Sequence, residues 1–356
     1  MRKQIFTAAL VVGCVTSMTA VAADVEEKTT VGGRAFIDLT NIDQEVNGTK
    51  TVPSGTGLDV KRFYIAVDHI FDSTWSANVT TDFNYVSADS ETQVFIKKAY
   101  VQAKISDALV IRAGSYDVPW IPFVEGLYGY RWVENVLVEH LKLQSSADWG
   151  VNASGSFADG KVNYAASVIG GSGYKKMVRS KGMDVEGRVS FVPVKGLTLA
   201  VGGYNGKLGQ ETEITDALHT AERWDLLAAY VNSKVRVGAE YFQSKNWNGT
   251  ANQVLTNATD KADGYSAWAS FNFTDTLAVF ARYDDAKLSK DLNPDLENKY
   301  FNVGLAFKPR KNVDLALVYK NDKVDNGPYG TSNATFGAGT VTGKFSEIGV
   351  WAQVSY

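Results

Sequence analysis

The strongest constraint on the fold is a repeated two-residue alternation of apolar and polar side chains. From Asp24 onward the chain contains sixteen such segments, for example residues 75–86 and 109–116. The spacers between them switch strictly between short turns, such as residues 72–74, and longer loops. A period of two is that of a β-strand, and short turns join antiparallel neighbours. Seven short turns and eight long loops place both chain ends on the short-turn side.

The last segment, residues 344–356, indicates how the sheet closes. One of its faces is apolar and consists of Ile348, Val350, Ala352, Val354 and Tyr356. Strands that end the chain on an aromatic residue resemble the closing strands of bacterial outer-membrane barrels. An open sheet edge in lipid leaves backbone groups unpaired, so this strand must pair with the first, near residues 30–40. The predicted fold is all-β, a sixteen-stranded antiparallel transmembrane β-barrel.

Charged side chains separate between the two faces of these strands. When apolar positions are phased outward, the outward face holds no Asp or Glu, and its only charges are Lys61 and Lys97, near strand ends. The inward basic residues are Arg34, Arg62, Lys98, Lys104, Arg112, Arg188, Arg223, Arg236, Arg282 and Lys320. The inward acidic residues are Asp38, Asp68, Asp82, Asp184, Glu186, Asp225, Glu240, Asp284, Asp314 and Glu347. A buried charge is costly unless it is paired or hydrated, so this partition predicts water inside the barrel.

Aromatic residues on the outward face gather at the strand ends. At the turn end they are Phe71, Trp75, Phe273 and Tyr356, and at the loop end Tyr85, Trp224, Tyr241, Tyr265, Tyr283 and Tyr319. Two such rows are typical of the interfacial girdles of a membrane barrel.

The N-terminus predicts export. Residues 1–23 have two basic residues, a short apolar run and a small-residue cleavage site, which is the pattern of a signal peptide followed by a mature chain of residues 24–356. A lipoprotein signal with lipidation at Cys14 is the weaker alternative, because the better cleavage site lies downstream. Cys14 is the only cysteine, so the mature chain has no disulfide or cysteine-based metal site. Removal of Arg2 and Lys3 leaves 34 basic and 39 acidic residues, a net charge of −5 that argues against nucleic acid as a partner.

Six segments carry a resemblance to a known family. They are residues 62–83 (RFYIAVDHIFDSTWSANVTTDF), 96–119 (IKKAYVQAKISDALVIRAGSYDVP), 148–171 (DWGVNASGSFADGKVNYAASVIGG), 185–203, 238–241 and 303–319. Each resembles a segment of the phosphate-selective porin O/P family. The resemblance implies a trimeric, sixteen-stranded outer-membrane porin whose third loop folds into the pore.

The longest loop, residues 117–147, agrees with that implication. Its apolar residues are Trp120, Ile121, Phe123, Leu127, Tyr128, Tyr130, Trp132, Val133, Val136, Leu137 and Leu141. A loop this apolar is not expected to stand in water, and loops this long are usually functional. Five of these residues, Trp132, Val133, Val136, Leu137 and Leu141, share one helical face, which predicts a short helix against the wall and a narrowed channel.

Sixteen strands enclose an aqueous channel whose selectivity depends on the charges at its constriction. We expect Lys98, Arg112, Arg131 and Lys142 there, set against Glu125, Glu134 and Glu139. The predicted pore-lining and constriction residues are Arg34, Arg62, Lys98, Arg112, Arg131, Glu134, Glu139, Lys142, Arg188, Arg223, Arg236 and Arg282. In the family it resembles, phosphate selection is attributed to a ladder of arginines and a cluster of lysines. The third loop here is net acidic and has no lysine cluster. We therefore predict passive diffusion of small hydrophilic solutes or ions, anions such as phosphate among them, with a weak charge preference.

Two other functions stay open. His140 beside Glu139, with Ser145 and Ser146 nearby, would suit an outer-membrane hydrolase. A secreted β-sandwich adhesion protein would also have alternating strands. A catalytic triad needs a geometry that neighbours in one loop do not supply, and a sandwich carries its charges on the outer face. The sequence therefore predicts no enzyme, no catalytic residue, no cofactor and no metal site.

The predicted partners follow from this fold. They are outer-membrane lipid and lipopolysaccharide around the barrel, small solutes or ions within it, and two further copies in a homotrimer. The trimer rests on the family resemblance, with support from the small outward residues Gly33 and Ala35, where subunits can pack closely. The predicted location is the bacterial outer membrane.

Overall fold

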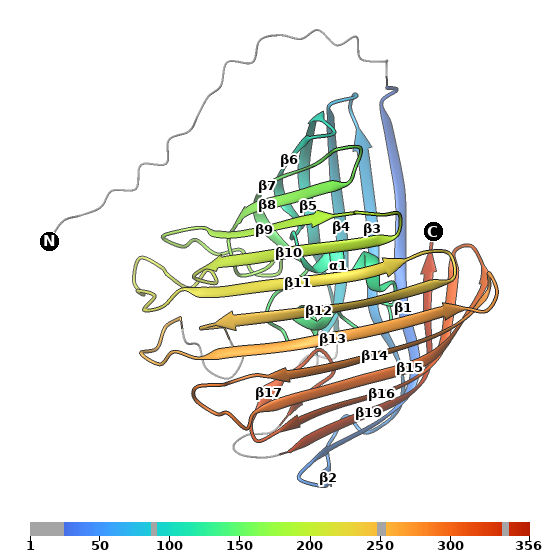
Figure 1. Ribbon diagram of the computed structural model, residues 1–356, viewed down its shortest axis with the longest axis vertical. Helices are drawn as coiled ribbons and strands as arrows, with labels where there is room; N and C mark the ends of the chain where they lie inside the picture. The colour runs from blue at the N-terminus through green and yellow to red at the C-terminus, as the bar shows by residue number, and fades with distance from the viewer. Residues whose placement is uncertain (1–24, 87–90, 248–253, 337–341) are drawn as a thin grey trace, which may run out of the picture.

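The computed structural model describes residues 25–86, 91–247, 254–336 and 342–356. Residues 1–23, the predicted signal peptide, lie outside the described part of the chain. The main sheet contains seventeen strands, one of which, β2 (Thr49–Lys50), has only two residues. The remaining sixteen form an antiparallel wall that closes through β1 and β19, as predicted (Figure 1). Closure pairs thirteen successive positions, from Arg34 with Ser355 to Val46 with Gly343.

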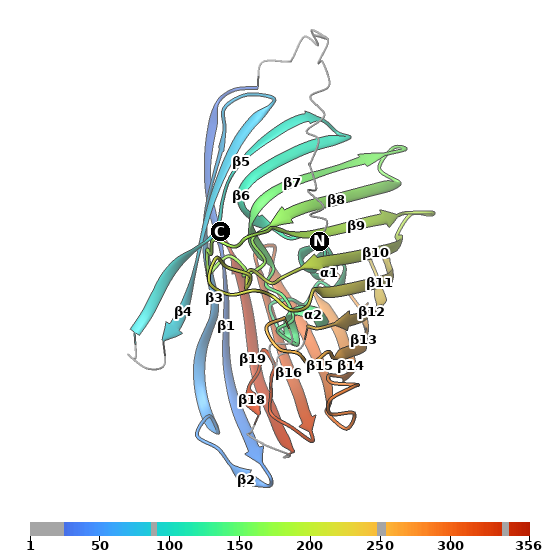
Figure 2. The same ribbon diagram turned by 90° about the vertical axis from the view of Figure 1, so that its left-hand side faces the viewer.

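The wall strands have these bounds: β1 Lys28–Val46, β3 Gly55–Ile70, β4 Trp75–Val86, β5 Glu91–Ser106, β6 Leu109–Asp117, β7 Ala147–Phe157, β8 Val162–Ile169, β9 Asp184–Phe191, β10 Leu197–Gly206, β11 Ala221–Val231, β12 Val235–Lys245, β13 Lys261–Asn272, β14 Leu277–Lys287, β15 Glu297–Arg310, β16 Val313–Asp325 and β19 Gly343–Ser355. The hairpin strands β17 (Tyr329–Gly330) and β18 (Thr335–Phe336) and the helices α1 (Ile121–Tyr128) and α2 (Leu137–His140) lie in loops. Figure 2 shows the β4–β5 end of the wall extending beyond its neighbours. None of the helices in the described residues is long and apolar enough to cross a bilayer.

The short turns are closed by their own polar side chains. A carboxylate oxygen of Asp72 accepts hydrogen bonds from the amides of Thr74 and Trp75, both at 2.7 Å. The Asn232 side chain accepts the corresponding pair at the β11–β12 turn, and the Thr274 hydroxyl does so at the β13–β14 turn. Residues of this kind favour tight turns because they supply an acceptor to amides that lack a strand partner. These turns lie where the sequence predicts them.

The two faces of the wall differ as predicted. In β11, Trp224, Leu226 and Tyr230 are exposed on the outward face, whereas Arg223 and Asp225 are buried on the inward face. The aromatic rows are also on the outward face, with Phe71, Trp75, Phe273 and Tyr356 exposed at the turn end and Trp224, Tyr241, Tyr265 and Tyr283 at the loop end. The side chain of Tyr85 is outside the described set. The outward surface therefore suits a hydrocarbon layer between two aromatic borders.

The prediction that Lys61 and Lys97 face outward is wrong. In each case the strand register skips one residue: Phe36 pairs with Arg62 and Ile37 with Val60, so Lys61 is the extra residue of a β-bulge. Lys97 is the extra residue in β5, between the pairs of Lys98 with Thr80 and Ile96 with Thr81. A bulge turns one additional side chain toward the same face. The Lys61 amine lies 3.5 Å from inward Asp38, and the Lys97 amine donates to the Tyr64 hydroxyl at 3.2 Å.

Acidic residues do occur on the outward face of the described strands, contrary to prediction, and Asp285 and Glu297 both lie at the loop end. Asp285 pairs in register with outward Tyr265 and accepts a hydrogen bond from the Tyr283 hydroxyl at 3.2 Å. Glu297 lies between Lys287 and Lys299, at 3.2 and 3.0 Å. The strands continue past the aromatic row into water, where an exposed ion pair costs little. The sequence pattern predicted the apolar zone but ended the strands too early.

The small residue Gly33 has a different role from the predicted subunit contact. Its amide and carbonyl pair with Tyr356, at 3.0 and 3.1 Å, and the Tyr356 ring covers it. A Cβ at this position would lie 2.2 Å from the ring. The chain's own last residue therefore occupies the space that we had assigned to a neighbouring subunit.

Candidate functional site

The third loop, residues 118–146, is built around two short helices and a glycine. Pro122 lies in the first turn of α1, where its missing amide hydrogen costs nothing. The helix ends at Gly129, which has a φ of 83° and donates its amide to the Glu125 carbonyl at 2.9 Å. A side chain at Gly129 would be strained and would lie 3.0 Å from the Arg236 guanidinium. The loop therefore turns sharply at a point that the wall contacts.

The apolar residues of this loop pack against inward-facing side chains of the wall. Trp120, Ile121, Val124, Tyr128 and Leu141 are all buried in one apolar cluster with wall residues such as Phe242 and Trp268. Trp120 lies over Gly202, where a Cβ would be 2.6 Å from its ring. The predicted helix over residues 132–141 is shorter than expected, because Val136 has an extended ψ of 162° and only Leu137–His140 are helical. The five residues assigned to its face are nevertheless all buried.

Inward arginines of β9, β12 and β14 bind the loop backbone. Arg188 donates to the Pro119 carbonyl at 3.0 Å, and its guanidinium lies 3.8 Å from the centre of the Phe123 ring. Arg236 donates to the carbonyls of Gly126 and Leu127, at 3.1 and 2.8 Å. Arg282 donates to the Asn135 carbonyl at 2.5 Å and forms a two-point pair with Asp284 at 2.8 and 2.5 Å. These three side chains therefore hold the loop.

Inward carboxylates of the same wall bind loop amides. Glu186 accepts the Trp120 amide at 3.2 Å, and Glu240 accepts the Leu137 amide at 3.1 Å. Buried Arg223 contacts Asp225 at 2.9 Å and Glu186 at 3.5 Å. A buried carboxylate is costly unless its oxygens accept hydrogen bonds, and the loop backbone supplies one donor each to Glu186 and Glu240. Much of the inward charge predicted to be hydrated is instead used to fix the loop.

A second charged group forms where the loop faces β3 and β5. Arg131 pairs with Glu125 and lies 3.2 Å from Glu139. Burial raises the pKa of Glu125. Burial also acts to raise the pKa of Glu139, but Arg131, Lys97 and Arg62 together outweigh burial, and the net pKa is lowered. Arg62 is within electrostatic range of Arg131 and lies 3.6 Å from Asp82. The predicted constriction residues Arg62, Arg131 and Glu139 are thus brought together. Lys97, which was predicted to face outward, also belongs to this group.

A third charged group joins the loop to β16 and β19. Glu134 lies 3.6 Å from Lys320 and 3.5 Å from His140, and Lys320 also lies 3.1 Å from Glu347. His140 is fully buried, and its other ring nitrogen lies 3.5 Å from Asp322. Burial opposes the charged form of His140, but Asp322 and Glu134 raise its pKa to about 9. The imidazole is therefore cationic at neutral pH.

The remaining predicted residues are separate from these groups. Lys98 pairs with Asp117 at 2.5 Å. Arg112 donates to the Gln102 side chain at 2.8 Å and lies 5.7 Å from the Tyr100 ring centre. Arg34 is exposed, in register with Ser355. Lys142 has a φ of 53° and is exposed at the end of α2. These four are not assembled into one constriction.

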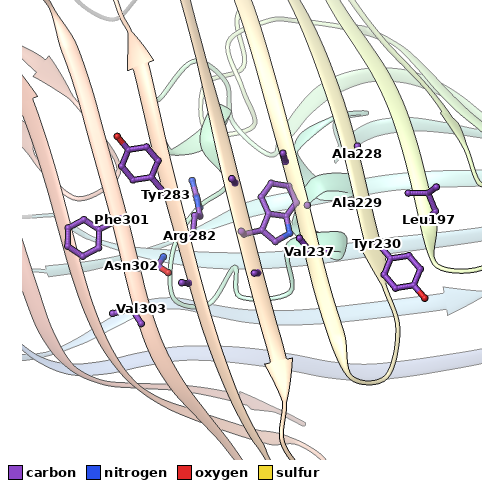
Figure 3. Close-up of a pocket in the computed structure, with 16 residues that line it drawn as sticks. Leu197, Ala228, Ala229, Tyr230, Val237, Arg282, Tyr283, Phe301, Asn302 and Val303 are labelled. Atoms are coloured by element: carbon purple, nitrogen blue, oxygen red, sulfur yellow. The ribbon is translucent and has the colours of Figure 1, made fainter.

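Two cavities lie on either side of the third loop. One, of about 460 Å³, is lined by Lys61, Arg62, residues 131–135 of the loop and residues 332–335 of the last loop. The other, of about 380 Å³, is lined by Tyr130, Arg236, Asp314 and Gln353, nearer the short turns. Trp132 lines both. Another hollow, of about 830 Å³, is an apolar groove on β10–β15, with Leu197 and Tyr230 at one side and Phe301 and Val303 at the other (Figure 3). Most of its lining residues are apolar or aromatic side chains on the outward face, so it belongs to the apolar surface.

Comparisons with known proteins bear on the fold. No family model matches the chain, and no curated protein sequence matches it. Solved structures that are similar include an anion-selective porin from Comamonas acidovorans, with 13% identity, a TM-score of 0.69 and coverage of 93% of this chain and 100% of that one. The outer-membrane channel DcaP of Acinetobacter baumannii has 12% identity, a TM-score of 0.62 and coverage of 93% and 97%. OmpT of Vibrio cholerae, in a trimer form, has 13% identity, a TM-score of 0.61 and coverage of 93% and 99%. The chain therefore has the barrel fold of these outer-membrane porins and channels, in its case with sixteen wall strands.

Proposed function

We propose that the chain is an outer-membrane porin through which small hydrophilic solutes and ions diffuse passively. The observation that carries this proposal is the partition of the closed wall, with apolar and aromatic residues outward and charged residues inward. A wall of this kind has no stable place in water, and sixteen strands are enough to surround an aqueous passage. The similarity of the fold to an anion-selective porin and an outer-membrane channel supports the same conclusion.

The third loop is proposed to fold into the lumen and to narrow the passage. Its hydrogen bonds to inward Arg188, Arg236 and Arg282 support this position. Solutes would pass between the two cavities beside Trp132, near Arg62, Arg131 and Glu139. Channel selectivity depends on which charges face the narrow part.

The charge preference of this passage is proposed to be weak. A ladder of free arginines is not expected along β9–β14, because Arg188, Arg223, Arg236 and Arg282 are bound to loop carbonyls or to acidic partners. At the loop, Arg131 is set against Glu125 and Glu139. Membership of the phosphate-selective porin O/P family remains a proposal from the sequence resemblance, and strong phosphate selection does not follow from it.

The location and assembly are proposed on the same basis. Residues 1–23 would direct export, and the aromatic rows would lie at the two surfaces of the outer membrane, with lipopolysaccharide around the loop end. A homotrimer is proposed from the family resemblance and from the trimer form of one similar structure. Gel migration before and after heating, together with mass measurement in detergent, tests the trimer.

Non-enzymatic transport is favoured over the hydrolase alternative by the surroundings of His140. Glu139 pairs with Arg131, and the hydroxyl at the His140 ring belongs to Ser332, 2.8 Å away. The Ser332 hydroxyl donates a hydrogen bond to the Glu134 carboxylate at 2.5 Å. A histidine with a pKa of about 9 is already protonated at neutral pH and is a poor general base.

The deciding experiment is electrical recording from purified protein in planar bilayers, with liposome swelling as a second assay. We expect stepwise, ohmic conductance in KCl, a permeability ratio of K⁺ to Cl⁻ within a few-fold of one, and swelling with small sugars. Strong block by phosphate together with a large anion preference would contradict the proposed selectivity. Protein that inserts correctly but never conducts would contradict transport.

A further inference from the structure

The last external loop contains a hairpin that is bonded to the third loop. β17 and β18 pair Tyr329 with Phe336, and both of these side chains are buried. The Tyr329 hydroxyl donates to the Leu141 carbonyl at 2.7 Å, and the Ser332 amide donates to the His140 carbonyl at 2.8 Å. Two backbone carbonyls at the end of α2 are therefore satisfied by a segment almost 200 positions away in the chain.

The contact between the two loops is centred on His140. One ring nitrogen lies 2.8 Å from the Ser332 hydroxyl and 3.5 Å from Glu134, and the other lies 3.5 Å from Asp322. Asp322 also accepts hydrogen bonds from Thr331 at 2.7 Å and Asn333 at 3.1 Å, both in the hairpin. A cationic imidazole between two buried carboxylates thus connects the third loop, β16 and the hairpin.

The hairpin also forms part of the larger cavity on this side of the third loop. Ser332, Asn333, Ala334 and Thr335 line it opposite Lys61 and Arg62 of β3. Gly343, at the start of β19, leaves room for the Phe336 ring, because a Cβ there would be 2.4 Å from it. The position of the hairpin therefore sets the width of the space that a solute entering from the loop side would cross.

We infer that the hairpin Tyr329–Phe336 is a second constriction element, held against the third loop by a latch in which His140 is the positioning residue, and that releasing the latch widens the passage. This inference rests on the proposed channel function. It adds to that function a movable element and the residue that controls it.

The latch should depend on pH with a defined sign. The groups that face His140 are Glu134 on its own loop, Asp322 on β16, Tyr300 on β15, whose ring centre is 4.7 Å away, and Ser332 on the hairpin, with Lys320 behind Glu134. The pKa of His140 is about 9 when latched and near its ordinary 6.5 when released into water. A group whose pKa is raised in the closed form stabilises that form fully below its lower pKa. This stabilisation is lost as the pH rises through the higher pKa. Closure should weaken on the order of a hundredfold between neutral pH and pH 10.

The test is conductance of the purified protein in bilayers at pH 7, 8, 9 and 10. We expect the wild type to gain a wider open state as the pH passes about 9. His140→Gln should show that state already at pH 7 and no step above it. A variant in which residues 330–335 are replaced by two glycines should be wide at every pH. The matched control is His219→Gln in another loop, which should keep the wild-type step.

A labelling measurement reports the latch independently of conductance. The only native cysteine, Cys14, lies in the predicted signal peptide, so one introduced cysteine can be followed alone. Thr331→Cys is placed at a fully buried position, and Val52→Cys at a position that is 99% exposed. The ratio of their maleimide labelling rates removes the intrinsic pH dependence of thiols, and it should rise between pH 7 and pH 10 only when His140 is present.

The outcomes separate the latch from the channel. If the hairpin replacement leaves conductance unchanged, or if His140→Gln keeps the pH step, the latch is wrong while the porin stands. A third outcome is that no variant conducts, while the labelling ratio rises with pH in the wild type and is independent of pH in His140→Gln. In that case the latch is supported and the transport proposal is wrong. A labelling ratio that stays constant from pH 7 to pH 10 overturns the latch by itself.

Discussion

Along β9–β14 the inward charges are bound to the third loop, whereas along β1–β5 they face the cavity and one another. Arg236 and Arg282 donate to loop carbonyls within 3.1 Å. On the other stretch of wall, the Lys61 side chain is 41% exposed and lines the larger cavity with Arg62. Arg62, Arg236 and Arg282 share the inward phase in the sequence, and Lys61 joins them through its β-bulge. Inward charge in this barrel therefore has two uses, to anchor a loop and to line a cavity.

The difference comes from what covers each wall. A buried guanidinium needs an anion or several carbonyl acceptors. The third loop supplies carbonyl acceptors, because its turns place them opposite the wall arginines. Lys61 needs no such cover because water reaches its amine. Substitutions on the anchoring side should therefore change stability, and substitutions on the lining side should change selectivity.

The largest effect is expected from Arg282→Met. It leaves Asp284 buried without a partner and removes the bond to the Asn135 carbonyl. We expect a loss of about 3–5 kcal/mol in the free energy of unfolding, measured by urea titration in lipid vesicles. The double variant Arg282→Met with Asp284→Leu should recover most of it, because no charge is left unpaired.

The matched control is Arg112→Met on β6, which adjoins the β1–β5 stretch. Arg112 is partly exposed and donates to a neutral side chain, that of Gln102. Its loss should cost about 1 kcal/mol. Equal losses for Arg112 and Arg282 would contradict the division into anchoring and lining charges.

The next effect concerns two glycines of the third loop that should respond in opposite directions. Gly129→Ala forces a Cβ into a φ of 83° and against Arg236, and should cost about 2 kcal/mol. Gly126 lies inside α1 with open space around its missing side chain, so Gly126→Ala should stabilise by about 0.5–1 kcal/mol. Both are measured by the same urea titration. A gain at both positions would mean that the Arg236 anchor does not hold the loop end.

The strands show how much of the fold could be predicted from the sequence. A two-residue period with one apolar face is a local signal, and it placed β4 at Trp75–Val86 without error. The phase of a strand can change at a bulge, and this was missed at Lys61 and Lys97. A signal was available, since each of these lysines precedes another basic residue, Arg62 and Lys98. Two adjacent charges in a lipid-facing strand can both point inward only if the strand bulges.

The site was harder to predict because it depends on distant contacts. The apolar character of the third loop was enough to predict that it packs on the wall. The use of Arg188 or Arg282 as an anchor depends on which carbonyl lies opposite, which no local pattern contains. Likewise, His140 and Ser332 are 192 positions apart. In the sequence His140 lies near Ser145 and Ser146 of its own loop. In the structure its ring contacts Ser332, which belongs to the last loop.

A smaller effect, on selectivity, is expected from Lys61→Gln. Removing one positive charge about 5 Å from a passing ion in water changes the energy of that ion by about 0.8 kcal/mol. This corresponds to about a fourfold change in the permeability of each ion, upward for cations and downward for anions, which shifts the permeability ratio toward cations. Reversal potentials in a KCl gradient measure it, and heat-dependent gel migration checks folding. Lys287→Gln on the outward rim is the control and should leave the ratio unchanged. A shift of the same size in both variants would place Lys61 outside the passage.

The smallest effect is expected where charge lies outside the barrel altogether. Lys299 is on the outward rim beyond the aromatic row, half exposed, with its amine 3.0 Å from Glu297. Exposed pairs of this kind contribute little because water and salt screen them, so Lys299→Gln should change the free energy of unfolding by less than about 0.5 kcal/mol. Lys320→Gln, in the buried group with Glu134 and Glu347, should cost several times more. If Lys299→Gln instead lowers the free energy of unfolding by more than about 1 kcal/mol, the Lys299 ammonium interacts with the charged membrane surface. The apolar zone would then end higher on the strands than the aromatic row indicates.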